Sequence, residues 1–192
     1  MVDDMLLVVR HADAGDKRGW EGPDGLRPLS PVGRCQAEGL LVRLEDYPVE
    51  RILCSPAVRC RQTVEPLARN RHLRIEPSAV LDVDADAAGV LETFWDGAVA
   101  DAVLCTHGET IGRLLEQLTT GGSVLEAPPH WPKGSTWLLQ RNGRRRVHAR
   151  YLPPLALDPR TCPPRSHLPT PGGRPGGDRP VGTALRGFTS CG

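Results

Sequence analysis

The chain has 192 residues, of which 39% are hydrophobic and 24% are charged, a composition typical of a folded domain with a buried core. Its net charge of +1 gives no reason to expect a nucleic acid or a membrane surface as partner. No apolar run approaches the roughly 20 residues that a membrane-spanning helix needs. Asp3 and Asp4 lie where a secretory signal would be basic, so we expect a cytoplasmic protein.

The six cysteines show neither a CxxC pair nor the compact spacing of a disulfide framework. Cys54 and Cys105 lie within apolar runs, where a free thiol behaves as a small hydrophobe. This pattern favours a reduced protein and gives little reason to expect a zinc site.

The first third of the chain predicts a strand, a long loop and a helix. An apolar run at residues 6–9 predicts the strand, which ends in Arg10 and His11. Residues 14–29 contain four glycines, two prolines and many charges, which indicates a loop of a length that is often functional. A serine followed by proline then opens a predicted helix over residues 30–44.

A second strand is predicted at residues 51–54, and Ser55 with Pro56 repeats the helix-start signal directly after it. Pro66 falls inside the next helical pattern, so we expect a kink or break near Val64. Three shorter elements complete this region: a candidate strand at residues 73–75, an acidic loop at 82–88 and a helix at 90–95.

A third buried strand is predicted at residues 102–106, followed by His107 and by a helix with one apolar face over residues 108–118. Residues 136–140 and 146–151 flank an Asn-Gly turn, which is a strong hairpin signal. Strands that alternate with helices predict an α/β fold with three layers, α/β/α, around a mostly parallel sheet, with the hairpin at its C-terminal end.

The C-terminal segment, residues 157–192, has a different composition. It holds seven prolines and seven glycines among its 36 residues, with few large apolar side chains. Such a segment does not bury enough surface to offset the entropy of ordering it. We therefore expect one domain at residues 1–156 and a disordered tail at residues 157–192.

Three predicted strands end in residues suited to binding an anion. The first ends in Arg10 and His11, the second leads into a helix with Arg59 and Arg61, and the third ends in His107. Because the carboxyl ends of parallel strands lie along one edge of a sheet, we expect these side chains to converge. Guanidinium groups and helix N-termini match the charge and geometry of phosphate oxygens.

This constellation resembles the histidine phosphatase superfamily, also called the phosphoglycerate mutase-like family, over about residues 5–152. Three motifs carry the resemblance: Val-Arg-His-Ala at residues 9–12, Ser-Pro-Ala-Val-Arg-Cys-Arg-Gln-Thr at residues 55–63, and Thr-His-Gly-Glu at residues 106–109. The resemblance implies the phosphoglycerate mutase-like fold.

The resemblance also implies a role for each matching residue. His11 corresponds to the nucleophile that attacks phosphorus and becomes phosphohistidine, which a neutral imidazole does without a metal or another cofactor. Arg10 and Arg59 correspond to the arginines that clamp the phosphate. His107 corresponds to the second histidine, which donates to a phosphoryl oxygen. Arg59 is preferred over Arg61, since residues two apart on a helix face different ways.

The sequence departs from the family pattern in two places. The usual Arg-His-Gly reads Arg-His-Ala here, as in the small SixA-like phosphohistidine phosphatase branch. The glutamate that mutase-type members carry after the third strand is missing, which weakens a mutase interpretation. Asp82 and Asp84 lie in about the right region, and Glu109 follows the second histidine, so any of the three, or none, protonates the leaving group.

A closer likeness is to the C-terminal histidine-phosphatase half of actinobacterial MutT-type Nudix hydrolases. Three segments carry it: residues 10–17, 27–29 and 133–137. A Nudix helix motif does not occur in the sequence. Lys17, Arg27 and Lys133 are then candidates for contacting the rest of the substrate, with solvated surface charges as the alternative interpretation.

The sequence therefore predicts a metal-independent phosphatase that hydrolyses a phosphomonoester or a phosphoamide through phosphorylated His11. Two alternatives stay open: an enzyme specific for phosphohistidine on proteins, and a phosphate-binding module without catalytic activity. The expected partner is a phosphorylated small molecule, a nucleotide or a phosphohistidine protein.

Overall fold

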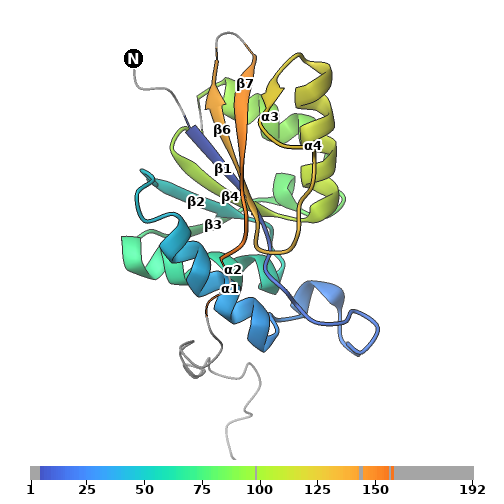
Figure 1. Cartoon of the computed structure of the whole chain (residues 1–192). Helices are drawn as coiled ribbons and strands as arrows, with labels where there is room; N and C mark the ends of the chain where they lie inside the picture. Colours follow the sequence, from blue (N-terminus) through green and yellow to red (C-terminus); the bar gives the residue numbers. More distant parts are fainter. Residues whose placement is uncertain (1–4, 98, 143–144, 156, 158–192) are drawn as a thin grey trace, which may run out of the picture. The chain divides into compact units, whose positions relative to one another are not determined.

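A seven-stranded sheet, in the order β3-β2-β4-β1-β6-β7-β5, organises the computed structural model, which describes residues 5–97, 99–142, 145–155 and 157 (Figure 1). β1, β2, β3 and β4 are mutually parallel, whereas β6 runs antiparallel to β1 and forms a hairpin with β7. The strands are β1 (Met5–Arg10), β2 (Arg51–Cys54), β3 (Ile75–Pro77), β4 (Ala102–Thr106), β5 (Val124–Leu125), β6 (Thr136–Arg141) and β7 (Val147–Leu152).

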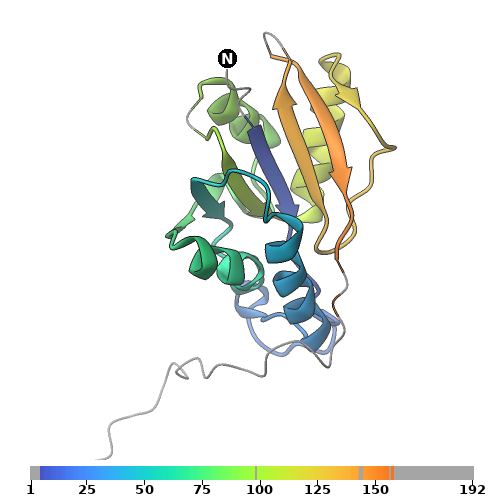
Figure 2. The same cartoon turned by 60° about the vertical axis from the view of Figure 1, so that its left-hand side comes forward.

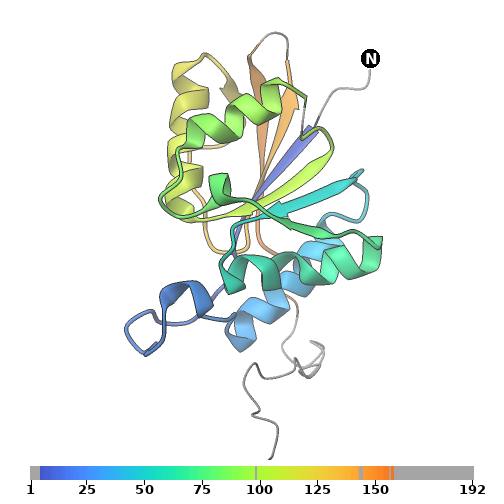
Figure 3. The same ribbon diagram turned by 180° about the vertical axis from the view of Figure 1, so that it is seen from behind.

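Helices cover both faces of this sheet, so the expected α/β/α architecture is confirmed. Figure 2 looks onto the side of α1, and Figure 3 shows the opposite side, where α3 and α4 lie. The helices are η1 (Asp24–Leu26), α1 (Pro31–Arg43), α2 (Val58–Arg71), η2 (Ala79–Leu81), α3 (Ala87–Trp95) and α4 (Gly108–Thr120).

β1 lies in the middle of the sheet and is buried on both faces. Leu7 and Val9 pack in the core with α1 and α2, whereas Leu6 and Val8 pack in the core with α3 and α4. A strand with two buried faces needs apolar side chains at consecutive positions, which explains the unbroken apolar run in the sequence.

The pairing of β1 with β4 brings two distant motifs together. Arg10 lies opposite Thr106 in the parallel register, and the His11 N–H donates to the Thr106 carbonyl at 3.0 Å. His11 and His107 therefore leave adjacent strands at the same edge of the sheet, where ligands bind in folds of this kind.

Several element boundaries differ from the sequence prediction. α2 begins at Val58 and not directly after Ser55 and Pro56, since Ala57 is its N-cap and has an extended backbone. The Ser55 hydroxyl bonds Asp82 and His107 besides the Ala57 N–H. β3 begins at 75 where the candidate strand was 73–75, and α3 begins at 87, inside the predicted acidic loop. Neither η1, η2 nor the two-residue β5 was predicted from the sequence.

Pro66 does not break its helix. α2 continues through it to Arg71, so the predicted break near Val64 is absent. Pro66 removes one backbone hydrogen bond, while Val64 and Leu67 on either side of it are fully buried in the core and hold the helix against the sheet.

The predicted tail lies outside the described residues except for Leu157, so the division at residue 156 stays a prediction. Within the part of the chain that the structure describes, no helix is long and apolar enough to cross a membrane.

Gly33→Ala is expected to destabilise the fold, because a Cβ at Gly33 would lie 1.9 Å from the Asp13 carbonyl oxygen. Relieving this contact requires backbone movement, so we expect a loss of about 1–3 kcal/mol in the free energy of unfolding, measured by urea denaturation. Gly89 is also the third residue of its helix, and a Cβ there meets only Val80 Cγ1 at 3.9 Å. Gly89→Ala should be neutral or stabilising by up to about 1 kcal/mol, and equal losses in the two variants would contradict the account.

Candidate active site

Two histidines face each other where β1 and β4 end. The ring centroids of His11 and His107 are 5.3 Å apart in an edge-to-face arrangement, and the residues are only 7% and 1% exposed. Arg10 precedes the first histidine, and Arg59 reaches the same place from the first turn of α2, with its Nη2 3.4 Å from His107 Nδ1. We call these four residues the clamp.

His11 is held as a neutral base with one free nitrogen. Its Nδ1–H donates to the Ala12 carbonyl at 2.8 Å, which leaves the lone pair on Nε2. Burial lowers the pKa of His11 to about 3, and the nearby His107, Arg59 and Arg10 add to the effect, against the Ala12 hydrogen bond. The imidazole is therefore unprotonated at neutral pH, the state that a nucleophile requires.

Both clamp arginines are tethered to backbone carbonyls. Arg10 Nη1 donates to the Trp131 carbonyl at 2.6 Å, and Arg59 Nη1 donates to the Asp24 carbonyl at 2.7 Å. The Nε atoms of both arginines are buried with no hydrogen-bond partner among the described residues, as on several other arginines of the chain. Burial lowers the pKa of Arg10, while the carboxylate of Glu109 counters this.

The start of α4 packs directly on Arg10. A Cβ at Gly108 would lie 2.9 Å from Arg10 Cζ, so only glycine admits the guanidinium at this distance. The first helical residue of α4 is therefore next to Arg10, and the N-terminal end of a helix adds positive potential where an anion would sit.

A hydrogen-bonded chain fixes His107. Its Nε2–H donates to Ser55 Oγ at 2.9 Å, and the Ser55 hydroxyl donates to Asp82 Oδ1 at 3.2 Å. This assigns the proton of the neutral ring to Nε2, since Nδ1 faces the donor group of Arg59. Asp82 Oδ1 is also 3.6 Å from His107 Nε2.

Asp82 lies in a loop that α4 fastens in place. Thr110 Oγ1 donates to the Asp82 carbonyl at 3.2 Å, and Arg113 Nη2 donates to the Val83 carbonyl at 3.1 Å. The Asp82 side chain is half-exposed, so one side of it meets solvent. Of the three carboxylates predicted near the site, Asp82 contacts the clamp, whereas Asp84 and Glu109 are exposed.

The three basic residues predicted to contact the rest of a substrate have different surroundings. Lys17 is largely exposed, 3.9 Å from Asp24 Oδ2. Arg27 is buried in the β1–α1 loop, and its Nη1 donates to the Ala14 carbonyl, so it is not a solvated surface charge. Lys133 donates to Asp13 Oδ1 at 2.6 Å.

The Asp13 carboxylate accepts further hydrogen bonds besides the one from Lys133. Its other oxygen accepts from the Ser30 hydroxyl and the Gly15 N–H. Burial alone would raise the pKa of Asp13, but these hydrogen bonds, led by the one from Lys133, lower it to about 2.

Sequence reasoning missed two residues of this site. Ser55 was interpreted as a helix-start signal, and Asp24 as part of a charged loop without a role. For Asp24, the signal available in the sequence was its spacing of three residues from Arg27, which often brings opposite charges together. In the structure the two side chains form an ion pair at 3.0 Å. Arg61, the rejected alternative to Arg59, is exposed.

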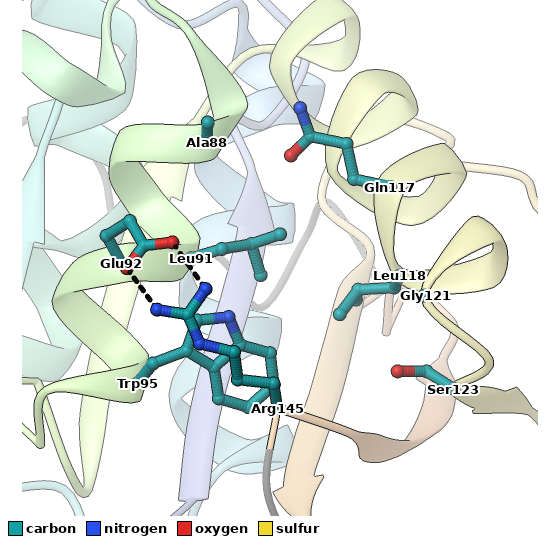
Figure 4. Close-up of a pocket in the computed structure, with 9 residues that line it drawn as sticks. All are labelled: Ala88, Leu91, Glu92, Trp95, Gln117, Leu118, Gly121, Ser123 and Arg145. Atoms are coloured by element: carbon teal, nitrogen blue, oxygen red, sulfur yellow. Dashed lines mark hydrogen bonds and ion pairs between the residues drawn. The ribbon is translucent and has the colours of Figure 1, made fainter.

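A cavity of about 210 Å³ lies away from the clamp, between α3 and the C-terminal end of α4 (Figure 4). The ion pair of Arg145 and Glu92 crosses it at 3.0 Å. Gln117, the first residue of α4 in the lining, comes ten residues after His107, so about 15 Å of helix separates this cavity from His107.

The clamp therefore brings two arginines and two histidines together at one edge of an α/β domain, and one of these histidines is kept unprotonated by burial. Residues 6–82 match the family model of the histidine phosphatase superfamily (branch 1). This match confirms the predicted resemblance over the residues that carry its first two motifs.

A curated relative from Mycolicibacterium smegmatis, named 8-oxo-(d)GTP phosphatase, is 35% identical over 156 residues. The match covers 78% of this chain but 48% of the relative, so the chain spans about half the relative's length. It fits the predicted likeness to one half of a MutT-type hydrolase.

Solved structures share the fold. The protein histidine phosphatase SixA complexed with tungstate has a TM-score of 0.62 at 20% identity, covering 79% of this chain and 96% of that one. A phosphohistidine phosphatase SixA from Nakamurella multipartitia has a TM-score of 0.61 at 23% identity, covering 81% and 99%. These neighbours confirm the phosphoglycerate mutase-like fold.

The protonation state of His11 can be tested by NMR. Because its pKa is lowered to about 3, its ring Cε1–H resonance should keep the position of the neutral form down to about pH 4. The resonance is assigned by its loss in His11→Asn. A titration midpoint near 6.5, the ordinary value for histidine, would contradict the account.

Proposed function

We propose that this protein is a phosphatase that hydrolyses a phosphomonoester or phosphoamide through a phosphohistidine at His11. The observation that carries the proposal is a buried, unprotonated imidazole with its Nε2 lone pair free, beside two arginines and a second histidine. In phosphoryl transfer, catalysis consists mainly of positioning and charge stabilisation, which such a clamp supplies without a metal ion.

The reaction has two steps. In the first, His11 Nε2 attacks phosphorus, the P–N bond forms, and the bond from phosphorus to the leaving oxygen or nitrogen breaks with its electron pair going to the leaving group. In the second, water attacks phosphorus, loses its proton to a base, and the P–N bond breaks to release inorganic phosphate. Arg10 and Arg59 neutralise the phosphoryl oxygens in both steps.

We assign the proton transfers to Asp82. It is connected to the clamp by hydrogen bonds, through Ser55 to His107. Its half-exposed side chain can meet both the leaving group and incoming water. We assign to His107, which Ser55 holds next to His11, a hydrogen bond to a phosphoryl oxygen.

The substrate class is proposed as a small phosphate ester, with nucleotides first. The support is the 35% identity to a relative named 8-oxo-(d)GTP phosphatase. The alternative substrate is phosphohistidine on proteins, which the SixA fold neighbours support. The leaving group of a phosphohistidine needs little acid catalysis, which also favours this alternative. A panel of nucleotides, sugar phosphates and a phosphohistidine protein separates these classes.

A module that binds phosphate without turnover is the second candidate, and the missing mutase-type glutamate favours it. Calorimetry that shows phosphate binding together with no hydrolysis across the substrate panel would select this function.

His11→Ala should abolish hydrolysis of p-nitrophenyl phosphate in the presence of EDTA, because the variant lacks the nitrogen on which the intermediate forms. We expect a loss of about 10³-fold or more in kcat. His72→Asn is the matched control, since His72 is exposed at the end of α2 and asparagine tolerates its left-handed backbone. Equal turnover by wild type and His11→Ala would contradict the proposal.

Asp82→Asn tests the assignment of the acid. A p-nitrophenolate leaving group needs almost no protonation, whereas an alkoxide does, so the rate of His11 phosphorylation, measured in a single turnover, should fall about 10²–10⁴-fold for an alkyl phosphate and far less for p-nitrophenyl phosphate. Asp84→Asn, two residues away on the same loop, should leave both rates unchanged. The same loss with both substrates would show that Asp82 has another role.

A further inference from the structure

Asp24 contacts Arg59 through two different acceptors. Its backbone carbonyl accepts from Arg59 Nη1 at 2.7 Å, and its Oδ2 lies 3.1 Å from Arg59 Nη2. Asp24 therefore holds both terminal nitrogens of the Arg59 guanidinium. Because the guanidinium is a rigid, planar fork, this fixes the direction of its remaining N–H groups.

The β1–α1 loop, residues 14–29, keeps Asp24 in place. Arg27 Nε donates to Asp24 Oδ1 at 3.0 Å, and Arg27 is itself buried with its Nη1 on the Ala14 carbonyl. The Arg27 N–H donates to the Asp24 carbonyl at 3.1 Å, the contact that closes η1. The carbonyl therefore cannot turn away from Arg59 unless η1 opens.

α2 is fastened to the same part of the chain by two further side chains. Gln62 Oε1 accepts from the Leu29 N–H at 2.8 Å, and Thr63 Oγ1 accepts from the Ala12 N–H at 2.9 Å. These residues lie three and four positions after Arg59, so all three occupy one face of α2. The loop and the helix that carries Arg59 thus meet at several points.

The Asp24 carboxylate is suited to be an anchor and not a proton donor. Burial alone would raise its pKa, but the hydrogen bond from Arg27 and the positive charges of Arg59, Arg27 and Lys17 lower it. It is therefore ionised at neutral pH. A carboxylate that stays ionised holds a cation firmly and gives up no proton.

We infer that Asp24 is a positioning residue of the clamp: it orients Arg59 for the phosphate, so that the β1–α1 loop sets phosphate affinity. The inference rests on the proposed function, since Arg59 must bind the phosphoryl group. It places the phosphate on the N–H groups of Arg59 that Asp24 leaves open, and Asp24 stays in place when the anion binds.

Asp24→Asn tests this inference, because it removes the charge and keeps the size and the backbone carbonyl. The Kd for inorganic phosphate, measured by calorimetry, and the KM for p-nitrophenyl phosphate should both rise about tenfold. The pH profile of kcat should keep its shape, and Asp24→Glu should recover part of the affinity. The matched control is Asp16→Asn on the same loop, where the carboxylate accepts the exposed Arg18 N–H; it should match wild type.

Arg59→Ala completes a double-mutant cycle. If Asp24 acts through Arg59, Asp24→Asn should change phosphate affinity little in the Arg59→Ala background. Tighter phosphate binding by Asp24→Asn would overturn the inference, because it would show that the carboxylate competes with the anion. An Asp24→Asn variant with unchanged phosphate affinity and a lower melting temperature would also overturn the inference, because it would show that Asp24 only stabilises the loop.

The wild-type protein distinguishes a failure of the inference from a failure of the proposed function. If wild type turns over substrate and Asp24→Asn has the same Kd and KM as wild type, the inference is overturned and the proposed function stands. A wild-type protein that neither binds phosphate nor hydrolyses any substrate overturns the proposed function and the inference with it.

Discussion

The parallel pairing of β1 with β4 is the constraint on which the site depends. The backbone bond from His11 to Thr106 closes this pairing at the edge where both strands end, and it brings His11 and His107 within ring contact. Both strands are buried on two faces, so a shift of register would displace core side chains on both sides of the sheet. The packing of the core and the geometry of the two histidines therefore both depend on the register between β1 and β4.

The clamp arginines depend on segments outside the sheet. Arg10 is tethered to the Trp131 carbonyl in the connection before β6, and Arg59 to Asp24 in the connection before α1. Both tethers keep the guanidinium groups close to the two histidines. Positive charge near His11 also helps to keep its imidazole neutral, so the residues proposed to bind the substrate are those that prepare the nucleophile.

Periodicity and strand direction were enough to predict the central part of the fold and of the site. Buried runs and apolar faces located β1, β4 and α4, and the rule that parallel strands end on one edge brought Arg10, His11 and His107 together. Ser55 and Asp24 were missed because short polar residues also cap helices and fill loops, so their type does not reveal a long-range contact. The expected break at Pro66 is absent because the local cost of the proline is outweighed by burial that only the tertiary structure shows.

In the proposed reaction, phosphorus bonds to His11 before water reaches it. The most direct measurement is the stereochemical course of hydrolysis of a thiophosphate monoester made chiral at phosphorus with oxygen isotopes, in water of a third oxygen isotope. Each in-line displacement inverts phosphorus, so transfer through phosphohistidine predicts net retention in the thiophosphate released. Net inversion would show a single displacement by water and would contradict the account.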